Sequence, residues 1–351
     1  MIKSIRLQNV RTFKDSVFNF EQGINLIIGK NGTGKTTILE SIGMLGFGKY
    51  MSISQDSFAI GPNSEAGRIE AELEFGEKRL VEVGFSPKEK IIQLDQSRVP
   101  VSILIGLQPQ IFFNPETVEL VFDSPALRRR ELDMVLTQSD HGFVIDILSF
   151  RKILKERNAL LRMISHNRSK VAELEFWDKR FVEFSKKIYS RRHDLINFYN
   201  QRIGGLFSSL SMKQGHLELK YLPSGDYDRI EEVLSAHLEN DLETGATSIG
   251  PHRDDFTFIY DHKQMRHGSS RGEQRLAAVA FKAAASEFLI EKGIDPIIIL
   301  DDVFSELDHS RQDAVADTLG LFKVRQVFIS ATDEKMVPEV LLSRANIIKL
   351  S

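Results

Sequence analysis

The chain has 351 residues, of which 42% are hydrophobic and 27% charged, with no cysteine and a formal net charge of -3. The length suits about two domains, and the composition is that of a globular protein with enough apolar material for a sizeable core. The lack of cysteine excludes disulfides, thiolate metal sites and cysteine nucleophiles. No apolar run is long enough to span a membrane, and the first residues lack the apolar stretch of a secretory signal. We therefore expect a cytoplasmic protein.

The first part of the chain is predicted to form strands around one helix. Alternating or continuous apolar residues predict strands near Ile5–Leu7, Val17–Phe20, Ile24–Ile28, Ile69–Phe75, Val81–Phe85 and Gln110–Phe113. In the runs Ile69–Phe75 and Val81–Phe85, apolar and polar residues alternate, so only one face of each strand is apolar, which is typical of antiparallel strands. A helical pattern runs from Gly34 to about Phe47.

The middle of the chain is predicted to be helical. Ser124 and Pro125 suit the N-cap and first position of a helix, and the helical pattern continues to about Phe207. Two apolar stripes, from Ile147 to Leu161 and from Leu174 to Phe198, predict two antiparallel helices with a turn at His166–Ser169. We interpret the aromatic residues of the second stripe as packing residues.

This middle segment is also basic. Between Glu119 and Gly205 there are 17 Lys and Arg against 12 Asp and Glu, which leaves 29 against 37 elsewhere. Such an asymmetry indicates an anionic partner for the segment. A solvated helical surface has the same composition, so charge alone leaves both interpretations open.

The last part returns to alternating strands and helices. We expect a strand at His216–Tyr221, a helix at Arg229–Glu239, polar loops around Gly245–Asp255, a helix at Glu273–Lys292, and strands at Ile297–Leu300 and Val327–Ile329. The last two are short and fully apolar, as at the centre of a parallel sheet.

A phosphate-binding loop follows the predicted strand at Ile24–Ile28. Residues 29–36 read G-K-N-G-T-G-K-T and match the Walker A pattern without a mismatch. The glycines let backbone N–H groups turn toward phosphates, and the helix that follows adds its positive dipole end. Lys35 can reach the β- and γ-phosphates, and Thr36 offers a hydroxyl to Mg²⁺. The candidate nucleotide-binding residues here are Gly29, Lys30, Asn31, Gly32, Thr33, Gly34, Lys35, Thr36 and Thr37.

A pair of carboxylates follows the apolar strand Ile297–Leu300. Asp301 is predicted to hold Mg²⁺, and Asp302 to orient or deprotonate the attacking water. About 265 residues separate this pair from the phosphate loop. We therefore predict an ATPase lobe split between residues 1–118 and 208–351, with a helical arm inserted at 119–207.

Two further stretches carry weaker signals. Ser269–Gln274 precedes the predicted helix at Glu273–Lys292 and forms a second turn suited to an anion, which fits the ATP of another subunit. An ordinary N-cap role for Ser270 remains open. Ser305–Asp308 follows the carboxylate pair and fits the same junction.

In this order, the motifs resemble those of ABC-type ATPases of chromosome maintenance and repair, and more narrowly the RecF family. The resemblance covers nearly the whole chain, and its residues are Asn9–Phe13, Gly29–Thr37, Phe112–Glu116, Ser124–Asp133, Gly250–Asp255, Ser270–Arg275 and Asp301–Asp308. It implies an α/β fold, with an ABC-type head of mixed sheets flanked by helices and an inserted α-helical arm.

The resemblance also implies a function. RecF-like proteins bind ATP and Mg²⁺, form ATP-dependent head-to-tail dimers, bind double-stranded DNA and single-strand/double-strand junctions, hydrolyse ATP slowly, and assist recombinase loading at gaps with RecO and RecR. In this sequence Ser270, with Gly272, would contact the γ-phosphate held by the partner's Lys35. Asp308 would lie at the dimer junction and Arg11 near the phosphates. Asn114 or Glu116 would stand where relatives place the lid that senses the γ-phosphate.

Many ABC proteins have a switch histidine after the strand that follows the carboxylate pair. The corresponding stretch here is Ile329–Asp333, which leaves two interpretations open: Thr332 substitutes for the histidine, or the contact is missing. Asp302 stands where transporters commonly have glutamate. His252 and Arg253 have two open interpretations, which are bracing of a loop and contact with nucleotide or DNA.

Non-sequence-specific DNA binding requires only phosphate contacts from cations. The candidates are Arg128, Arg129, Arg130, Arg151, Lys152, Lys155, Lys186, Lys187, Arg191 and Arg192. Because Arg128–Arg130 also resembles a family-wide motif close to the ATPase core, coupling of the arm to the ATP site remains an open alternative for these three. Two alternatives to a DNA clamp remain: a transporter-type ATPase subunit, which the late signature and the inserted arm disfavour, and a nucleotide-dependent protein scaffold without DNA contact.

Overall fold

The computed structural model describes residues 1–50, 55–213, 215–304, 309–321 and 324–350. The chain forms two compact units. Unit 1 consists of Met1–Val118, Leu206–Lys213 and Arg271–Ser351, and unit 2 of Glu119–Gly205 and Gln214–Ser270. No helix within the described ranges is long and apolar enough to cross a bilayer.

Unit 1 contains an antiparallel sheet of six strands in the order β2-β1-β4-β5-β6-β7. The strands are β1 (Ile2–Val10), β2 (Phe13–Asn19), β4 (Gly67–Phe75), β5 (Glu77–Phe85), β6 (Lys90–Leu94) and β7 (Ser97–Arg98). Alternate side chains of β4, such as Ile69, Ala71 and Leu73, are buried. The alternation read from the sequence thus marks the face that covers the core.

The second sheet of unit 1 is parallel, with five strands in the order β14-β3-β13-β12-β8. The strands are β3 (Gly23–Ile28), β8 (Gln110–Phe113), β12 (Ile297–Leu300), β13 (Gln326–Ala331) and β14 (Ala345–Lys349). Every residue of β8, β12 and β13 is buried. Strands covered on both faces are mainly apolar, and the apolar runs at Ile111–Phe113, Ile297–Leu300 and Val327–Ile329 made these strands visible in the sequence.

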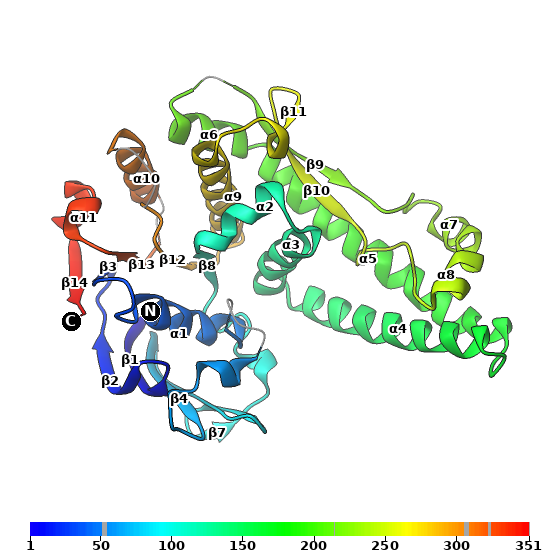
Figure 1. Ribbon diagram of the computed structural model, residues 1–351, viewed down its shortest axis with the longest axis horizontal. Coiled ribbons are helices and arrows are strands. Elements are labelled where there is room, and N and C mark those ends of the chain that lie inside the picture. Colours follow the sequence, from blue (N-terminus) through cyan, green and yellow to red (C-terminus); the bar gives the residue numbers. More distant parts are fainter. Residues whose placement is uncertain (51–54, 214, 305–308, 322–323, 351) are drawn as a thin grey trace. The chain divides into compact units, whose positions relative to one another are not determined.

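Helix α1 (Lys35–Phe47) joins the two sheets of unit 1 in one core (Figure 1). Leu7 and Ile69 of the antiparallel sheet, Ile38 and Ile42 of α1, and Phe328 of the parallel sheet belong to one buried cluster. The other helices of this unit are α9 (Arg271–Glu291), α10 (His309–Leu321) and α11 (Glu339–Leu342), with short 3₁₀ turns η1 (Asp56–Ala59), η2 (Val101–Ile103), η3 (Pro115–Val118) and η6 (Glu334–Met336).

Unit 2 is built on a helical hairpin of α4 (His141–Ser165) and α5 (Leu174–Asn200). Asp140 caps α4 by accepting hydrogen bonds from Gly142 N and Phe143 N. The remaining elements are α2 (Glu119–Phe122), α3 (Pro125–Ser139), α7 (Ile230–Ala236), α8 (Leu238–Thr244), β9 (Leu217–Leu222), β10 (Asp255–Tyr260), β11 (Lys263–Gln264), η4 (Val171–Glu173) and η5 (Met265–His267). α6 (Ile203–Ser211) crosses from unit 2 into unit 1.

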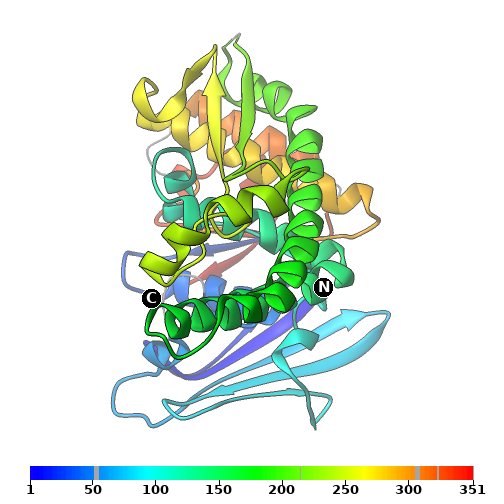
Figure 2. The same cartoon turned by 90° about the vertical axis from the view of Figure 1, so that its right-hand side faces the viewer.

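The α/β class is confirmed, and one expected element differs locally. The helix expected at Arg229–Glu239 is two helices, because the backbone breaks at His237. The break lets α7 contact α5 and α8 contact α4, and both lie beside the hairpin in Figure 2 (yellow-green beside green).

The compact units also differ from the expected domain boundaries. Residues 215–270 group with the hairpin and not with the ATPase lobe. The reason is that β9 contacts α5, and β10 pairs with β9 and contacts α3. The assignment of separate functions to the two units stays a prediction.

Candidate nucleotide-binding site

The phosphate loop lies between β3, which ends at Ile28, and α1, which begins at Lys35. Gly34 has φ of 100°, and a Cβ at this position would lie 2.6 Å from the Phe13 ring. A larger residue would meet both backbone strain and a collision. Gly34 therefore allows the tight approach of the loop to the start of the helix, where free N–H groups favour an anion.

Lys35 is buried over the loop. Its ammonium donates to Gly29 O at 2.7 Å and to Lys30 O at 3.1 Å, and its relative exposure is 8%. The hydroxyl of Thr33 donates to the same Lys30 carbonyl. The loop thus holds a positive charge beside the start of α1, as the sequence pattern predicts for a residue that reaches phosphates.

Asp301 and Asp302 follow β12 directly. Asp301 is buried, and its Oδ1 accepts a hydrogen bond of 2.6 Å from Ser330 Oγ. Burial raises the pKa of Asp301, and hydrogen bonds from Ser330 and Thr36 partly oppose this rise. Asp302 is half-buried with φ of 55°, a left-handed conformation that is unusual for a residue other than glycine. Its backbone N–H donates to Ser330 Oγ at 2.9 Å.

The phosphate loop and the carboxylates meet at one edge of the parallel sheet. β3, β13 and β12 are adjacent, so their carboxyl ends bring Ile28, Ala331 and Leu300 to the same side. A cleft of about 300 Å³ lies there. Its lining residues are Arg11, Thr12, Asn31, Gly32, Gly34, Lys35, Thr36, Thr37, Pro115, Asp301, Asp302 and Thr332.

Arg11 is positioned at this cleft by an ion pair. Its guanidinium lies 2.7 Å from the carboxylate of Glu40, which is 1% exposed, and 5.7 Å from the centre of the Tyr50 ring. Glu40 lies on α1 one turn beyond Thr36. Neither Glu40 nor Tyr50 stood out in the sequence, because a glutamate in a helix carries no signal of burial.

Several other candidates do not line the cleft. Asn114 Oδ1 accepts a hydrogen bond from Thr117 Oγ, next to the cleft residue Pro115. Lys30 is exposed, Gly29 O accepts from the Lys35 ammonium, and the Thr33 hydroxyl donates to Lys30 O. Ser270 is exposed and directly precedes α9, in which Gly272 is the second residue. Asp308 lies outside the described residues.

Two residues missed by sequence reasoning hold the Asp301–Asp302 turn. Ser330 is 1% exposed and bonds to both aspartates, as described above. Arg275 of α9 donates to Asp302 O and to Val303 O, and its guanidinium lies over the Phe113 ring. The signal for Arg275 was its place in the Ser270–Arg275 motif, from which only the serine and the glycine were taken as site residues.

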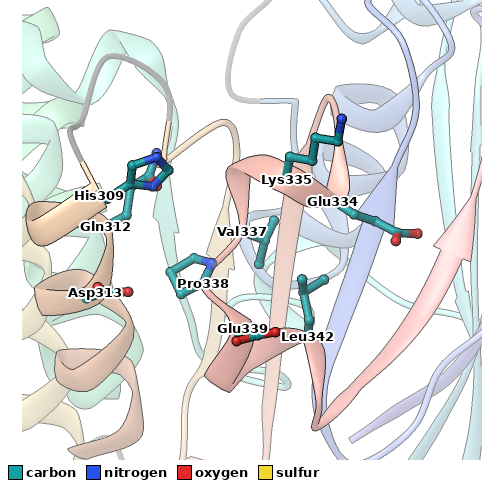
Figure 3. A pocket seen from close by; sticks show the side chains of 9 residues that line it. All are labelled: His309, Gln312, Asp313, Glu334, Lys335, Val337, Pro338, Glu339 and Leu342. Carbon is teal, nitrogen blue, oxygen red and sulfur yellow. The ribbon is translucent and has the colours of Figure 1, made fainter.

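A larger groove of about 420 Å³ lies between α10 and α11 (Figure 3). Its walls include Asp313, Glu334 and Glu339, and Val337 and Pro338 lie between the two helices. Three carboxylates repel a polyphosphate, and the groove has no glycine loop. The described residues contain no cluster of three His, Asp or Glu that would hold a metal ion. The smaller cleft is therefore the better nucleotide site.

In unit 2, Arg128 and Arg192 are buried, which does not support them as DNA contacts. Arg128 binds both carboxylate oxygens of Asp255 at 2.7 and 2.8 Å, and Arg192 binds those of Asp133 at 2.9 and 3.0 Å. Their relative exposures are 5% and 2%. A guanidinium enclosed in this way cannot reach a DNA phosphate unless the unit repacks.

The remaining candidates differ in accessibility. Arg129 is half-buried and donates to Asp254 O at 2.7 Å, Arg130 is half-buried, and Arg191 lies 2.7 Å from Asp140. The exposed ones are Arg151, Lys152, Lys155, Lys186 and Lys187. Lys187 pairs with Glu183 at 2.8 Å, whereas Arg151, Lys152, Lys155 and Lys186 have no carboxylate within 4 Å among the residues that the structure describes.

The Gly250–Asp255 motif braces unit 2 from inside. Asp254 is fully buried and accepts hydrogen bonds from the hydroxyls of Tyr221 and Tyr227. His252 lies beside the Phe150 ring, with Nε2 2.9 Å from Thr247 O. Burial lowers the pKa of His252 to about 4, so it is neutral at pH 7. These contacts favour the bracing interpretation for His252, while Arg253 is exposed.

Comparison with known proteins identifies the family. The family described as "RecF/RecN/SMC N terminal domain" matches residues 1–349. The proteins called "DNA replication and repair protein RecF" from Moorella thermoacetica and Staphylococcus aureus are 30% and 31% identical, over 100% of this chain and 95% and 98% of theirs.

Solved structures give the same result. A chain described as "Structure of the recombination mediator protein RecF-ATP in RecFOR pathway" has a TM-score of 0.86 at 28% identity, covering 95% of this chain and 94% of that one. A Smc head bound to part of ScpA has a TM-score of 0.59 at 17% identity, over 99% of this chain and 93% of that one, which shows a shared fold.

The fold and the cleft define an ABC-type ATPase head of the kind found in RecF, RecN and SMC proteins. Within that class the match extends over the full length of RecF relatives at 30% identity. The chain belongs to the RecF family, as the motifs in its sequence predicted.

Proposed function

We propose that this chain is an ATP-dependent DNA-binding protein of DNA replication and recombinational repair, which hydrolyses ATP slowly as a switch. The observation that carries the proposal is the single cleft in which the phosphate loop, Arg11 and the Asp301–Asp302 pair meet. The names of the full-length relatives supply the context of replication and repair.

The chemistry follows from the residues of the cleft. Lys35 and the N–H groups at the start of α1 bind the phosphates, and Arg11 adds a second positive charge. The buried carboxylate of Asp301 and the hydroxyl of Thr36 are the oxygen ligands that Mg²⁺ prefers. When bound, Mg²⁺ neutralises charge that develops on the phosphates. Asp302 orients the attacking water and accepts its proton.

The proposed active form is an ATP-dependent head-to-tail homodimer. Ser270 is exposed and directly precedes a 21-residue helix, whose positive dipole end suits a phosphate held by another subunit. Gly272 and Asp308 belong to the same proposed junction. Because Arg275 of this helix bonds to the backbone of Asp302 in its own subunit, the helix is also tied to its own cleft.

Mixing two inactive variants tests the dimer. Lys35→Ala disables one half of each composite site, and Ser270→Arg the other half. A head-to-tail heterodimer of the two variants has one site with both changes and one intact site. We expect each variant alone to be inactive in ATP hydrolysis and the mixture to recover up to about half of the wild-type rate per heterodimer. No recovery in a mixture that forms heterodimers would contradict the shared site.

The proposed partners are double-stranded DNA, single-strand/double-strand junctions, and the mediators RecR and RecO, in the cytoplasm. The exposed cations Arg151, Lys152, Lys155 and Lys186 support non-sequence-specific contact with phosphates. Arg129, Arg130, Lys187 and Arg191 remain weaker candidates, because they are half-buried or paired.

Binding to a labelled duplex, with and without ATP, at several salt concentrations, tests the whole proposal. We compare wild type with Asp302→Asn, which keeps the phosphate loop but loses the base, and with Asp313→Asn, an exposed control on α10. We expect ATP to tighten binding and Asp302→Asn to hold DNA longer after ATP is added. Binding that is indifferent to ATP would exclude a gated clamp, and no binding at low salt would favour the protein scaffold.

A further inference from the structure

Unit 2 contains a second cleft, of about 270 Å³, to which the function proposed above assigns no role. It lies between the C-terminal half of α5 and β9, and Ile196 and Leu219 form its buried apolar base. None of its lining residues is among those of the ATP cleft.

Aromatic rings form one wall of this cleft. Tyr189 and His193 are four residues apart on α5 and therefore share a face of the helix. Their ring centroids are 5.6 Å apart with 28° between the planes, and Tyr189 also stacks on Tyr227 at 4.1 Å and 6°. Tyr221 stands edge-on to both Tyr189 and His193. The wall is a preformed stack of rings, and such stacks bind the flat face of a nucleobase.

A donor and an acceptor lie next to this wall. Asn197 Nδ2 is 3.1 Å from His193 Nδ1. With the amide as donor, Nδ1 accepts, so Nε2 carries the N–H and can donate to a ligand, and Asn197 Oδ1 can accept. Asn200 holds the base of the cleft in place, because its amide bonds to Leu219 N and O at 2.7 and 2.9 Å.

The cleft also has a cation at its rim. Lys220 is exposed on β9, and no carboxylate lies within 4 Å of its ammonium among the described residues. Because side chains alternate along a strand, Lys220 points to the opposite face of β9 from Leu219 and Tyr221, and its long side chain reaches a ligand in the cleft only around the free edge of this edge strand. A flat aromatic wall, an adjacent donor and acceptor, and one lysine match the parts of a nucleotide, which are a base, its polar edge and its phosphate.

We propose that this cleft binds one unpaired nucleotide, with the base against His193 and Tyr221 and the phosphate at Lys220. The nucleotide is either part of a DNA strand or a free mononucleotide, since both present the same chemistry. For a DNA strand, the proposal rests on the DNA-binding function proposed above, and it adds a reason for preferring DNA with unpaired bases.

The test compares DNAs that differ only in the presence of unpaired bases. Fluorescence anisotropy with saturating ATP, which fills the other cleft, gives Kd for a blunt duplex, for the duplex with a short overhang, and for the duplex with an abasic overhang of equal charge. We expect the base-containing overhang to bind at least about fivefold more tightly than the abasic one. His193→Ala removes this ratio and leaves the blunt duplex unchanged.

Lys220→Ala weakens binding of both overhangs, whereas Lys263→Ala, a matched exposed lysine on the same sheet, leaves them unchanged. If His193→Ala does not fold, Lys220→Ala still tests the site, because replacing an exposed lysine should not disturb folding. Competition by dTMP separates the two sources: displacement of the overhang shows that a free nucleotide binds as well, and no displacement assigns the cleft to a strand.

A base-to-abasic ratio near one in wild type, or a ratio that His193→Ala leaves unchanged, overturns the inference while blunt-duplex binding still stands. Binding of both overhangs that Lys220→Ala leaves unchanged overturns the phosphate contact. If the blunt duplex does not bind either, the DNA-binding function fails. Direct binding of dTMP to the protein, abolished by His193→Ala, would then be the remaining support, and its absence would overturn the inference too.

Discussion

At the scale of single residues, the most informative side chains are buried and polar. Ser330 has no assigned role in the reaction, yet its hydroxyl donates to the Asp301 carboxylate and accepts from Asp302 N. We predict that Ser330→Ala raises the half-saturating Mg²⁺ concentration for ATP hydrolysis about tenfold, because Asp301 loses a donor that favours its charged form. Ser343→Ala, on the exposed end of α11, is the control. An unchanged Mg²⁺ dependence would assign Ser330 to folding alone.

His252 gives a prediction about pH. Its pKa is about 4 in the folded chain, against 6.5 for a histidine in an unfolded chain, so the unfolded state binds more protons between these values. Stability from this group is complete above pH 6.5 and is lost as pH falls toward 4. We expect a loss of about 2 kcal/mol between pH 7.5 and 5. Urea titrations at several pH values measure how the free energy of unfolding depends on pH. This dependence should be smaller in His252→Gln than in wild type, whereas His262→Gln, an exposed control, should keep it.

At the scale of elements, ion pairs join segments that are distant in sequence. Arg128 of α3 reaches Asp255 of β10 across 127 positions. We predict that Arg128→Ala destabilises unit 2 by about 3–5 kcal/mol, because it leaves Asp255 without its partner. Lys152→Ala, on the exposed face of α4, should change stability by less than about 0.5 kcal/mol. Urea unfolding followed by circular dichroism measures both, and equal effects would show that Arg128 acts as a surface cation.

The same pairs explain what could be predicted from the sequence. The parallel sheet and the phosphate site could be predicted because they depend on local patterns. These patterns are the buried runs at Ile24–Ile28 and Ile297–Leu300 and the glycine loop before α1. Whether an arginine faces solvent depends on carboxylates far away in the chain, so Arg128 and Arg192 were read as DNA contacts. The grouping of β9 and β10 with the hairpin depends on long-range packing in the same way.

At the scale of the whole molecule, the proposed clamp predicts a defined response to salt. Each cation that neutralises a DNA phosphate contributes about 0.9 to the slope of log Kd against log salt. Arg151, Lys152 and Lys155 are exposed on α4 and unpaired in the described part of the chain. Changing all three to alanine should lower the slope by up to about 2.7 and weaken binding to every duplex sequence alike.

The control is a triple variant with the same change of charge, Lys14→Ala, Lys88→Ala and Lys263→Ala, at exposed positions outside α4. If a general attraction of DNA to positive charge causes binding, both triple variants lower the slope equally. If α4 carries the contact, only the first does so, and ATP still tightens the residual binding because the nucleotide cleft is unchanged. A slope that neither variant alters would move the DNA contact away from this helix, to Lys186 and the half-buried Arg129, Arg130 and Arg191.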